Sequence, residues 1–177
     1  MFKVILKKIY ILLKNDLQKG KKVLFSGTLC QVKAISNYVM NSKISSENLY
    51  LIDFICHDVP SPKIWSSYLN YISKNKNLLE INFRNKSSAG WHDYFYAKYE
   101  DNSQLKQSHE IHLYMRIFLS NKNIRPVCYE CQFKDEQCYS DITLGDAWKV
   151  EKEKPKWADY KGISVFIVRS TKGEKLL

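Results

Sequence analysis

Hydrophobic positions at helical spacing open the chain. Apolar residues recur every three or four positions across 2–13, with lysines filling much of the space between them. This period predicts an amphipathic helix, and Gly20 is a residue able to end it. Continuous apolar runs at 23–25 and 49–55 each predict a buried strand, with a helix between them through about residue 40. The first third is therefore predicted as a helix followed by a strand–helix–strand unit.

The middle of the chain changes to an alternating pattern. A proline-bracketed turn at 60–62 precedes a helix expected over about 63–73. Alternating apolar and polar residues at 81–84 and 94–99 then flank a Ser-Ser-Ala-Gly turn. Alternation of this kind predicts antiparallel strands, and hence a small β-meander inserted at about 80–105.

The last third returns to mixed elements. A helix is expected over 109–119, a cysteine-containing loop over about 125–140, and strands over 141–146 and 163–168. Residues 170–177 resemble a turn and the start of a further helix, so we expect the chain to stop where an element should begin. The whole chain is predicted as a single domain of the α/β (α+β) class, with a mixed sheet, flanking helices and an antiparallel insertion.

Composition narrows the class of protein. Hydrophobic residues make up 45% and charged residues 26% of the chain, which is typical of a folded domain. The net charge of +10 is spread along the sequence, so we expect no nucleic acid, although an acidic electron carrier is compatible with it. Lys or Asp interrupts every long apolar run, and no secretory signal is recognisable. We therefore expect no transmembrane segment and a soluble, cytoplasmic protein.

The five cysteines raise the question of metal binding or redox chemistry, because the cytosol keeps thiols reduced. The strongest local signal is Cys128-Tyr129-Glu130-Cys131. Two thiolates at this spacing can face one metal, as they do in zinc and iron–sulfur sites. The same spacing occurs in redox dithiols, but these usually open a helix in a thioredoxin-like unit, and no such pattern precedes this motif.

A metal site needs about four ligands, so two more must come from elsewhere. Cys30 and Cys56 are the candidates, because each lies just past the carboxyl end of a predicted strand, where parallel sheets assemble their sites. Taken singly, each is equally interpreted as an inert buried thiol. Cys138 is the fifth cysteine, and we expect it to be a bystander.

Three further patterns leave two interpretations open. Ser26-Gly27-Thr28 can cradle a phosphate at a helix start, or it can be an ordinary turn with Thr28 as the N-cap. His109 and His112 would lie on adjacent helix turns, as metal ligands or as solvated side chains. His57 can donate a hydrogen bond to a cluster sulfur or contact a flavin, or it can be a partly buried packing residue.

Several ordered motifs resemble one known family. Gly-Thr-Leu-Cys-Gln at 27–31 resembles the Gly-Thr-Pro-Cys-Gln motif of the coenzyme F420 hydrogenase/dehydrogenase beta-subunit family, C-terminal domain. Asp-Phe-Ile-Cys-His-Asp-Val-Pro-Ser-Pro at 53–62 resembles its Cys-His-Gly-Val-Pro-Ser-Pro motif. Phe-Arg-Asn-Lys at 83–86, the segment 125–131 and Ser-Asp-Ile-Thr-Leu-Gly-Asp-Ala-Trp at 140–148 follow in the family's order. The resemblance covers nearly the whole chain.

The resemblance implies a flavin-dependent oxidoreductase domain that binds FAD and a 4Fe-4S cluster. A flavin would exchange hydride with a two-electron acceptor and single electrons with the cluster. The four motif cysteines, Cys30, Cys56, Cys128 and Cys131, would ligate the cluster. The residues expected to contact the flavin or the substrate are Gly27, Thr28, Gln31, His57, Arg84 and Lys86.

The resemblance also implies partners. Relatives exchange electrons with a ferredoxin-type carrier or with a separate ferredoxin-like domain, and they act on a small-molecule acceptor. The subgroup with the most similar Cys-His motif is associated with surface-polysaccharide genes, so a link to polysaccharide biosynthesis is expected.

The sequence departs from the family pattern at several positions. Leu29 replaces a proline, Asp58 replaces a glycine, and Cys138 stands where the subgroup usually has arginine. We also expect the N-terminal ferredoxin-like domain common in the family to be absent. Two alternatives to an active enzyme follow: a zinc-stabilised, non-enzymatic interaction module, and an inactive, truncated relative.

Overall fold

The computed structural model describes residues 2–85, 94–133, 139–157 and 162–177. The chain divides into two compact units, each with its own hydrophobic core. The first unit comprises Met1–Cys56, Gln132–Trp148 and Ile163–Leu177, and the second comprises His57–Cys131 and Lys149–Gly162. Helices combine with one mixed and one antiparallel sheet, so the fold belongs to the α+β class that the sequence predicted.

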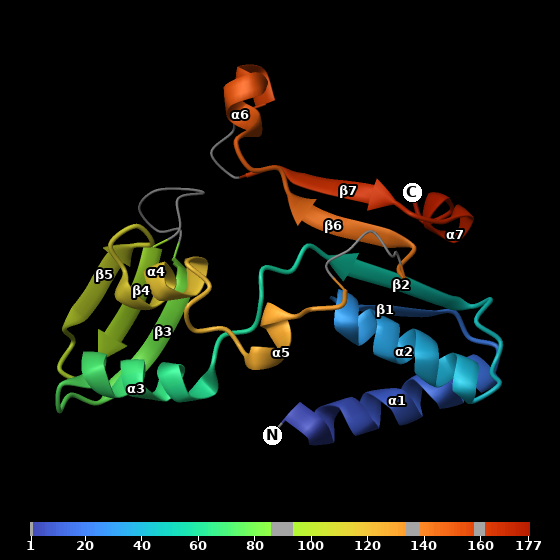
Figure 1. Ribbon diagram of the computed structural model, residues 1–177, viewed down its shortest axis with the longest axis horizontal. Helices are drawn as coiled ribbons and strands as arrows, with labels where there is room; N and C mark the ends of the chain where they lie inside the picture. The colour runs from blue at the N-terminus through green and yellow to red at the C-terminus, as the bar shows by residue number, and fades with distance from the viewer. Residues whose placement is uncertain (1, 86–93, 134–138, 158–161) are drawn as a thin grey trace. The chain divides into compact units, whose positions relative to one another are not determined.

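The first unit is built on a four-stranded sheet with the order β1-β2-β6-β7 (Figure 1). Strands β1 (Val23–Thr28), β2 (Leu49–Phe54) and β6 (Ile142–Asp146) are parallel, and β7 (Ser164–Val168) runs antiparallel to β6. The mixed sheet predicted from the apolar runs is confirmed. Each strand extends or shortens by a few residues, as is usual at element ends.

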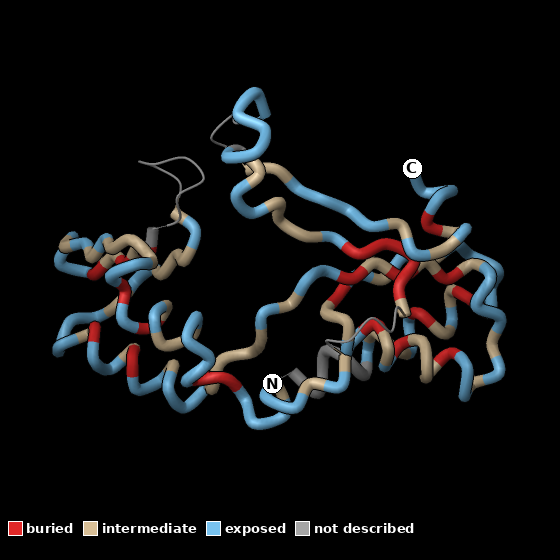
Figure 2. Tube along the Cα trace, turned by 45° about the horizontal axis from the view of Figure 1, so that its top comes forward, coloured by how far each residue is buried: buried red, intermediate tan, exposed pale blue. Residues whose placement is uncertain are grey.

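Helices α1 (Phe2–Gln18) and α2 (Leu29–Asn41) pack on one face of this sheet (Figure 1). After α1, Gly20 adopts a φ of 72°, the left-handed conformation that glycine accepts readily. The core is the layer between helices and sheet, seen as buried stretches in Figure 2. Its buried members are Leu13, Leu17, Val32, Ile35, Val39, Leu49 and Leu51.

The short helix α7 (Thr171–Glu174) follows β7. A Cβ atom on Gly173 would lie 2.2 Å from the backbone oxygen of Asp141, so only glycine allows this approach. Asp141 receives hydrogen bonds from the N–H of Leu51 at 2.8 Å and from the Ser170 hydroxyl. These contacts attach the carboxyl-terminal turn to the start of β6.

The second unit is a three-stranded antiparallel sheet with the order β3-β4-β5, packed against helices. Alternating side chains of β4, Phe95, Ala97 and Tyr99, form the buried face. Its elements are α3 (Pro62–Ser73), β3 (Leu78–Asn85), β4 (Tyr94–Tyr99), β5 (Gln104–Ser108), α4 (Leu113–Leu119), α5 (Pro126–Tyr129), α6 (Val150–Glu153) and the 3-10 helix Pro155–Trp157.

Several boundaries differ from the sequence prediction. The turn expected at 26–28 is the end of β1, and the helix expected from residue 109 begins at Leu113 with His112 as its N-cap. His109 and His112 therefore do not lie on adjacent helix turns, and that prediction was wrong. His109 bonds through Nε2 to the Phe83 carbonyl at 2.9 Å. The Ser-Ser-Ala-Gly turn lies outside the described residues.

His112 lies fully buried in the core of the second unit. Its Nδ1 accepts the N–H of Met115 at 3.3 Å, and its Nε2 lies 2.5 Å from the Tyr68 hydroxyl. Because Nδ1 is an acceptor, the ring proton is on Nε2, which donates to the Tyr68 oxygen. The Phe95 ring stacks on the imidazole at 3.9 Å. Burial, with a smaller contribution from His109, lowers the pKa of His112 to about 4, so the ring is neutral at neutral pH.

The lowered pKa of His112 predicts that the protein loses stability in acid. Below its ordinary pKa of 6.5 the unfolded chain binds a proton on His112, whereas the folded chain keeps the ring neutral down to about pH 4. The contribution of the neutral His112 ring to stability is thus fully present above pH 6.5. It is lost as the pH falls towards 4, at roughly 1.4 kcal/mol per pH unit. His112→Asn keeps an N-cap acceptor and should flatten this slope in urea unfolding. An unchanged slope would contradict the assignment.

A helix must be long and apolar to cross a membrane. Within the part of the chain that the structure describes, no helix is both long enough and apolar enough to cross a membrane.

Candidate functional site

Cys30 and Cys56 both lie just beyond the carboxyl ends of two neighbouring strands of the four-stranded sheet. Strands β1 and β2 are parallel, with Thr28 paired in register with Phe54. Cys30 and Cys56 each follow two residues after these partners, so both leave the carboxyl edge of the sheet. The N–H of Ile55 donates to the Leu144 carbonyl at 2.8 Å, which holds the residue before Cys56 against β6. The parallel register therefore brings together two cysteines that are far apart in sequence.

Cys30 occupies the first turn of α2, where backbone N–H groups favour negative charge. The Thr28 hydroxyl and the Cys30 sulfur share a hydrogen bond at 3.1 Å. The N–H of Thr28 donates to Oε1 of Gln31 at 3.0 Å. That N–H is thus already occupied, as expected for an N-terminal cap. The Cys30 side chain itself is exposed.

Gly27 allows this cap to form. A Cβ atom at this position would lie 2.8 Å from Oε1 of Gln31, so a larger residue would displace the glutamine from the Thr28 N–H. Of the predicted cofactor contacts, Gly27, Thr28 and Gln31 thus lie together beside Cys30. In the described structure, the side-chain oxygen of Gln31 accepts the hydrogen bond of the Thr28 N–H at the start of α2.

Asp53 is a candidate functional residue that the sequence analysis did not single out. It is paired in register with Gly27 on one side and Thr143 on the other. Its side chain is only 3% exposed, and its Oδ1 has no hydrogen-bond partner. A buried acceptor without a donor costs free energy, so a ligand or an ordered water is expected to supply one. The signal available in the sequence was a carboxylate in the inward alternation Leu49, Leu51, Asp53.

The unpartnered carboxylate leads to a stability prediction. Asp53→Asn should raise the free energy of unfolding of the ligand-free chain by about 1 kcal/mol, because an amide is easier to bury than a carboxylate of the same shape. Urea unfolding measures the difference, with Glu47→Gln as a control that makes the same carboxylate-to-amide change at an exposed position. A destabilised Asp53→Asn protein would show that the carboxylate already has a compensating partner.

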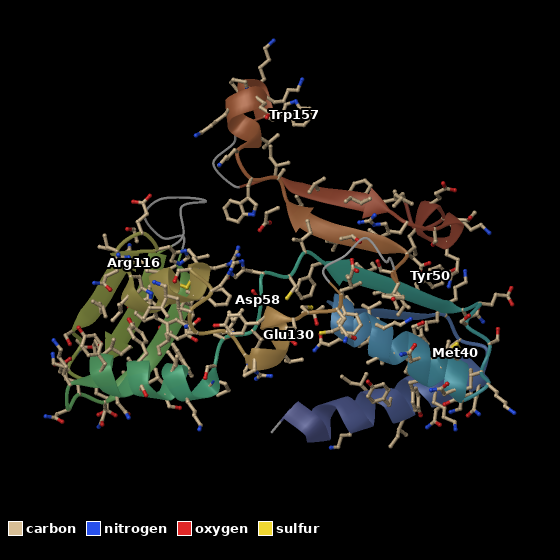
Figure 3. All side chains as sticks on the ribbon, in the orientation of Figure 1. Met40, Tyr50, Asp58, Arg116, Glu130 and Trp157 are labelled. Atoms are coloured by element: carbon tan, nitrogen blue, oxygen red, sulfur yellow. The ribbon has the colours of Figure 1, made fainter. Side chains whose placement is uncertain are left out.

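The Cys-x-x-Cys motif belongs to the second unit. Cys128 lies in α5, its N–H donating to the Arg125 carbonyl at 2.9 Å, and Cys131 follows the helix. Both cysteines are partly buried, whereas Tyr129 and Glu130 between them are exposed; Glu130 is labelled in Figure 3. This pattern is typical of a turn with its two sulfurs on the inner side.

Two short segments of the second unit hold the start of this motif. Pro60 and Ile124 form an antiparallel bridge. It is flanked by hydrogen bonds from Ser61 N–H to the Asn123 carbonyl at 2.6 Å and from Arg125 N–H to the Val59 carbonyl at 2.9 Å. The segment that follows Cys56 in sequence is therefore bonded to the segment that precedes Cys128.

Asn123 is a second buried polar residue that sequence reasoning missed. Its side chain is 1% exposed, and neither its Oδ1 nor its Nδ2 has a hydrogen-bond partner. An amide with both groups unsatisfied is rare in folded proteins. No sequence signal distinguishes it from the many surface asparagines of this chain.

The remaining predicted contacts lie in the second unit or outside the described residues. The His57 ring packs edge-on against Phe118 at 4.9 Å, and its Nε2 lies 3.4 Å from the Phe118 carbonyl. Arg84 is exposed on β3, with its N–H donating to Oδ1 of Asn82 at 2.8 Å. Lys86 and Cys138 lie outside the described residues.

The four cysteines expected to be ligands divide evenly between the two units. None of Cys30, Cys56, Cys128 and Cys131 forms a disulfide. Each unit supplies two of them, and among the described residues no three His, Cys, Asp or Glu side chains form a group able to hold a metal ion. Neither unit alone thus provides a complete four-thiolate site.

An α+β fold whose cysteines follow parallel strands and fill a Cys-x-x-Cys turn defines a class of domain suited to redox or metal chemistry. Residues 20–177 match the family described as Coenzyme F420 hydrogenase/dehydrogenase, C terminus of the beta subunit. The chain belongs to this family, and it is an oxidoreductase-related domain of that type. No curated protein matched the chain in a sequence search.

Proposed function

We propose that this chain is an electron-transfer domain of a flavin- and iron–sulfur-dependent oxidoreductase. Family membership carries the proposal, because the matched region spans both units and all five cysteines. When bound, the cluster would accept and donate single electrons and FAD would exchange two, allowing the domain to connect one-electron and two-electron carriers.

The donor chemistry of the chain fits a 4Fe-4S cluster. Such clusters require cysteine thiolates, and the proposed ligands are Cys30, Cys56, Cys128 and Cys131. None is held in a disulfide, and all four have exposed surface through which a cluster could be loaded. The hydroxyl of Thr28 already bonds to the Cys30 sulfur, an interaction that would orient this ligand.

Polar groups beside Cys30 support the flavin part of the proposal. Thr28, Gln31 and the unpartnered Asp53 lie at the carboxyl edge of a parallel sheet, the usual place for nucleotide ligands. His57 and Arg84 of the second unit, and Lys86, complete the proposed set. Their role would be to bind and orient the flavin. The Asp53 carboxylate could accept a hydrogen bond from a hydroxyl group of the ligand.

The partners follow from the same chemistry. We propose a ferredoxin-type carrier, or a separate ferredoxin-like domain, on the one-electron side and a small-molecule acceptor on the two-electron side. A role in surface-polysaccharide biosynthesis in the cytoplasm is part of this proposal and derives from the motif resemblance alone.

Anaerobic reconstitution with ferrous iron, sulfide and FAD tests the proposal. The expected product is brown, with about four iron and four sulfide per chain, and its bound FAD should be photoreducible. A colourless protein that holds one zinc per chain would instead identify a zinc-stabilised module. A protein with the cluster but without FAD binding would contradict the oxidoreductase assignment and leave a simple electron carrier.

A further inference from the structure

We infer that the second unit has a binding groove for a small aromatic anion, between α3 and the edge strand β5. The groove has a volume of about 470 Å³, within the ~300–1000 Å³ typical of small-molecule sites. Its lining comes from α3 and the turn after it, from the end of β4, from β5 and the residue before it, and from the start of α4. All of these elements belong to the second unit and are labelled in Figure 1. None of the lining residues belongs to the cysteine segments, so this site goes beyond the proposed function.

Aromatic and apolar side chains supply part of the lining, and polar side chains supply the rest. Tyr99 is buried, and its hydroxyl donates to the Ile72 carbonyl at 3.0 Å, which fixes the ring against α3. Tyr71 also lines the groove but is 59% exposed, as are large parts of Ile111 and Leu113. A planar ligand would cover these surfaces, because rings stack favourably on tyrosine and remove apolar area from water.

The charge of the groove distinguishes the class of ligand. Of its two lysines, Lys76 is already compensated by Asp101 at 2.7 Å and donates to Ser103 at 2.9 Å. Lys74 has no ion pair among the residues that the structure describes, and its Nζ lies 5.9 Å from the centroid of the Tyr71 ring. One uncompensated cation beside aromatic rings is complementary to a ring that carries a single carboxylate, sulfonate or phosphate group.

A pair of fluorescent probes tests this site in the full chain. Anilinonaphthalene sulfonate has the proposed chemistry, and N-phenylnaphthylamine is the same ring system without its charge. The sulfonate should bind saturably and about fivefold more tightly than the amine, the effect expected of one partly exposed charge contact. Lys74→Gln should abolish this difference and leave binding of the neutral amine unchanged.

Two matched variants complete the test. Lys98→Gln removes the same charge from the outer face of β4, since alternation places Lys98 opposite the buried Ala97, and it should change neither affinity. Ile111→Glu should weaken both probes, the sulfonate more. Equal affinities in the unmodified chain, an equal effect of Lys74→Gln and Lys98→Gln, or binding that Ile111→Glu leaves unchanged would each overturn the inference.

Discussion

Replacing Cys128 with serine is expected to reduce the iron bound after reconstitution from about four per chain to near zero. A serine hydroxyl has the shape of the thiol but is a poor ligand for iron, and a cluster held by three thiolates is readily lost. Cys131→Ser should behave alike, because both residues belong to one turn of the second unit. Iron and acid-labile sulfide analysis, together with visible absorption, measures the effect.

Cys138→Ser is the matched control, since it removes a thiol that lies outside the proposed ligand set. Its iron content should equal that of the unmodified chain. An equal loss of iron in Cys138→Ser would overturn the ligand assignment. Cys30→Ser and Cys56→Ser extend the test to the first unit, where retention of full iron would show that the two cysteine pairs do not serve one cluster.

Replacing Phe95 with alanine should destabilise the second unit by about 4 kcal/mol. The Phe95 side chain is fully buried in the core of this unit, against the rings of Phe83 at 5.2 Å and Tyr68 at 6.0 Å. Alanine would leave a cavity and also remove the stacking partner of His112. Urea unfolding, with hydrogen exchange of the β4 amides as a probe of this unit, measures the change.

Leu79→Ala provides the control on the neighbouring strand. Leu79 is 58% exposed, so its removal should change the free energy of unfolding by no more than about 0.5 kcal/mol. If Phe95→Ala cost less than about 1 kcal/mol, the ring cluster around His112 would not be the stabilising core described above.

The elements that sequence reasoning predicted well are those whose signal is local. Continuous apolar runs marked β1 and β2, and helical spacing marked α1, because each pattern depends only on which face of that element is buried. The edge strand β5 was missed as a separate strand, since its sequence Gln-Leu-Lys-Gln-Ser has one apolar residue. His109 and His112 were placed in a helix because one was expected from residue 109, yet the helix begins after them.

The class of fold and the family could be predicted from the order of amino acids, and both are confirmed. The four cysteine ligands and the polar contacts beside Cys30 stay predictions. The three-dimensional structure was needed to show that Cys30 and Cys56 share a sheet edge, that Asp53 and Asn123 are buried without partners, and that Lys74 lines an aromatic groove. The physical reason is the range of the interactions. Periodicity and caps arise between residues a few positions apart, whereas pairing, burial and charge compensation depend on which distant segments meet.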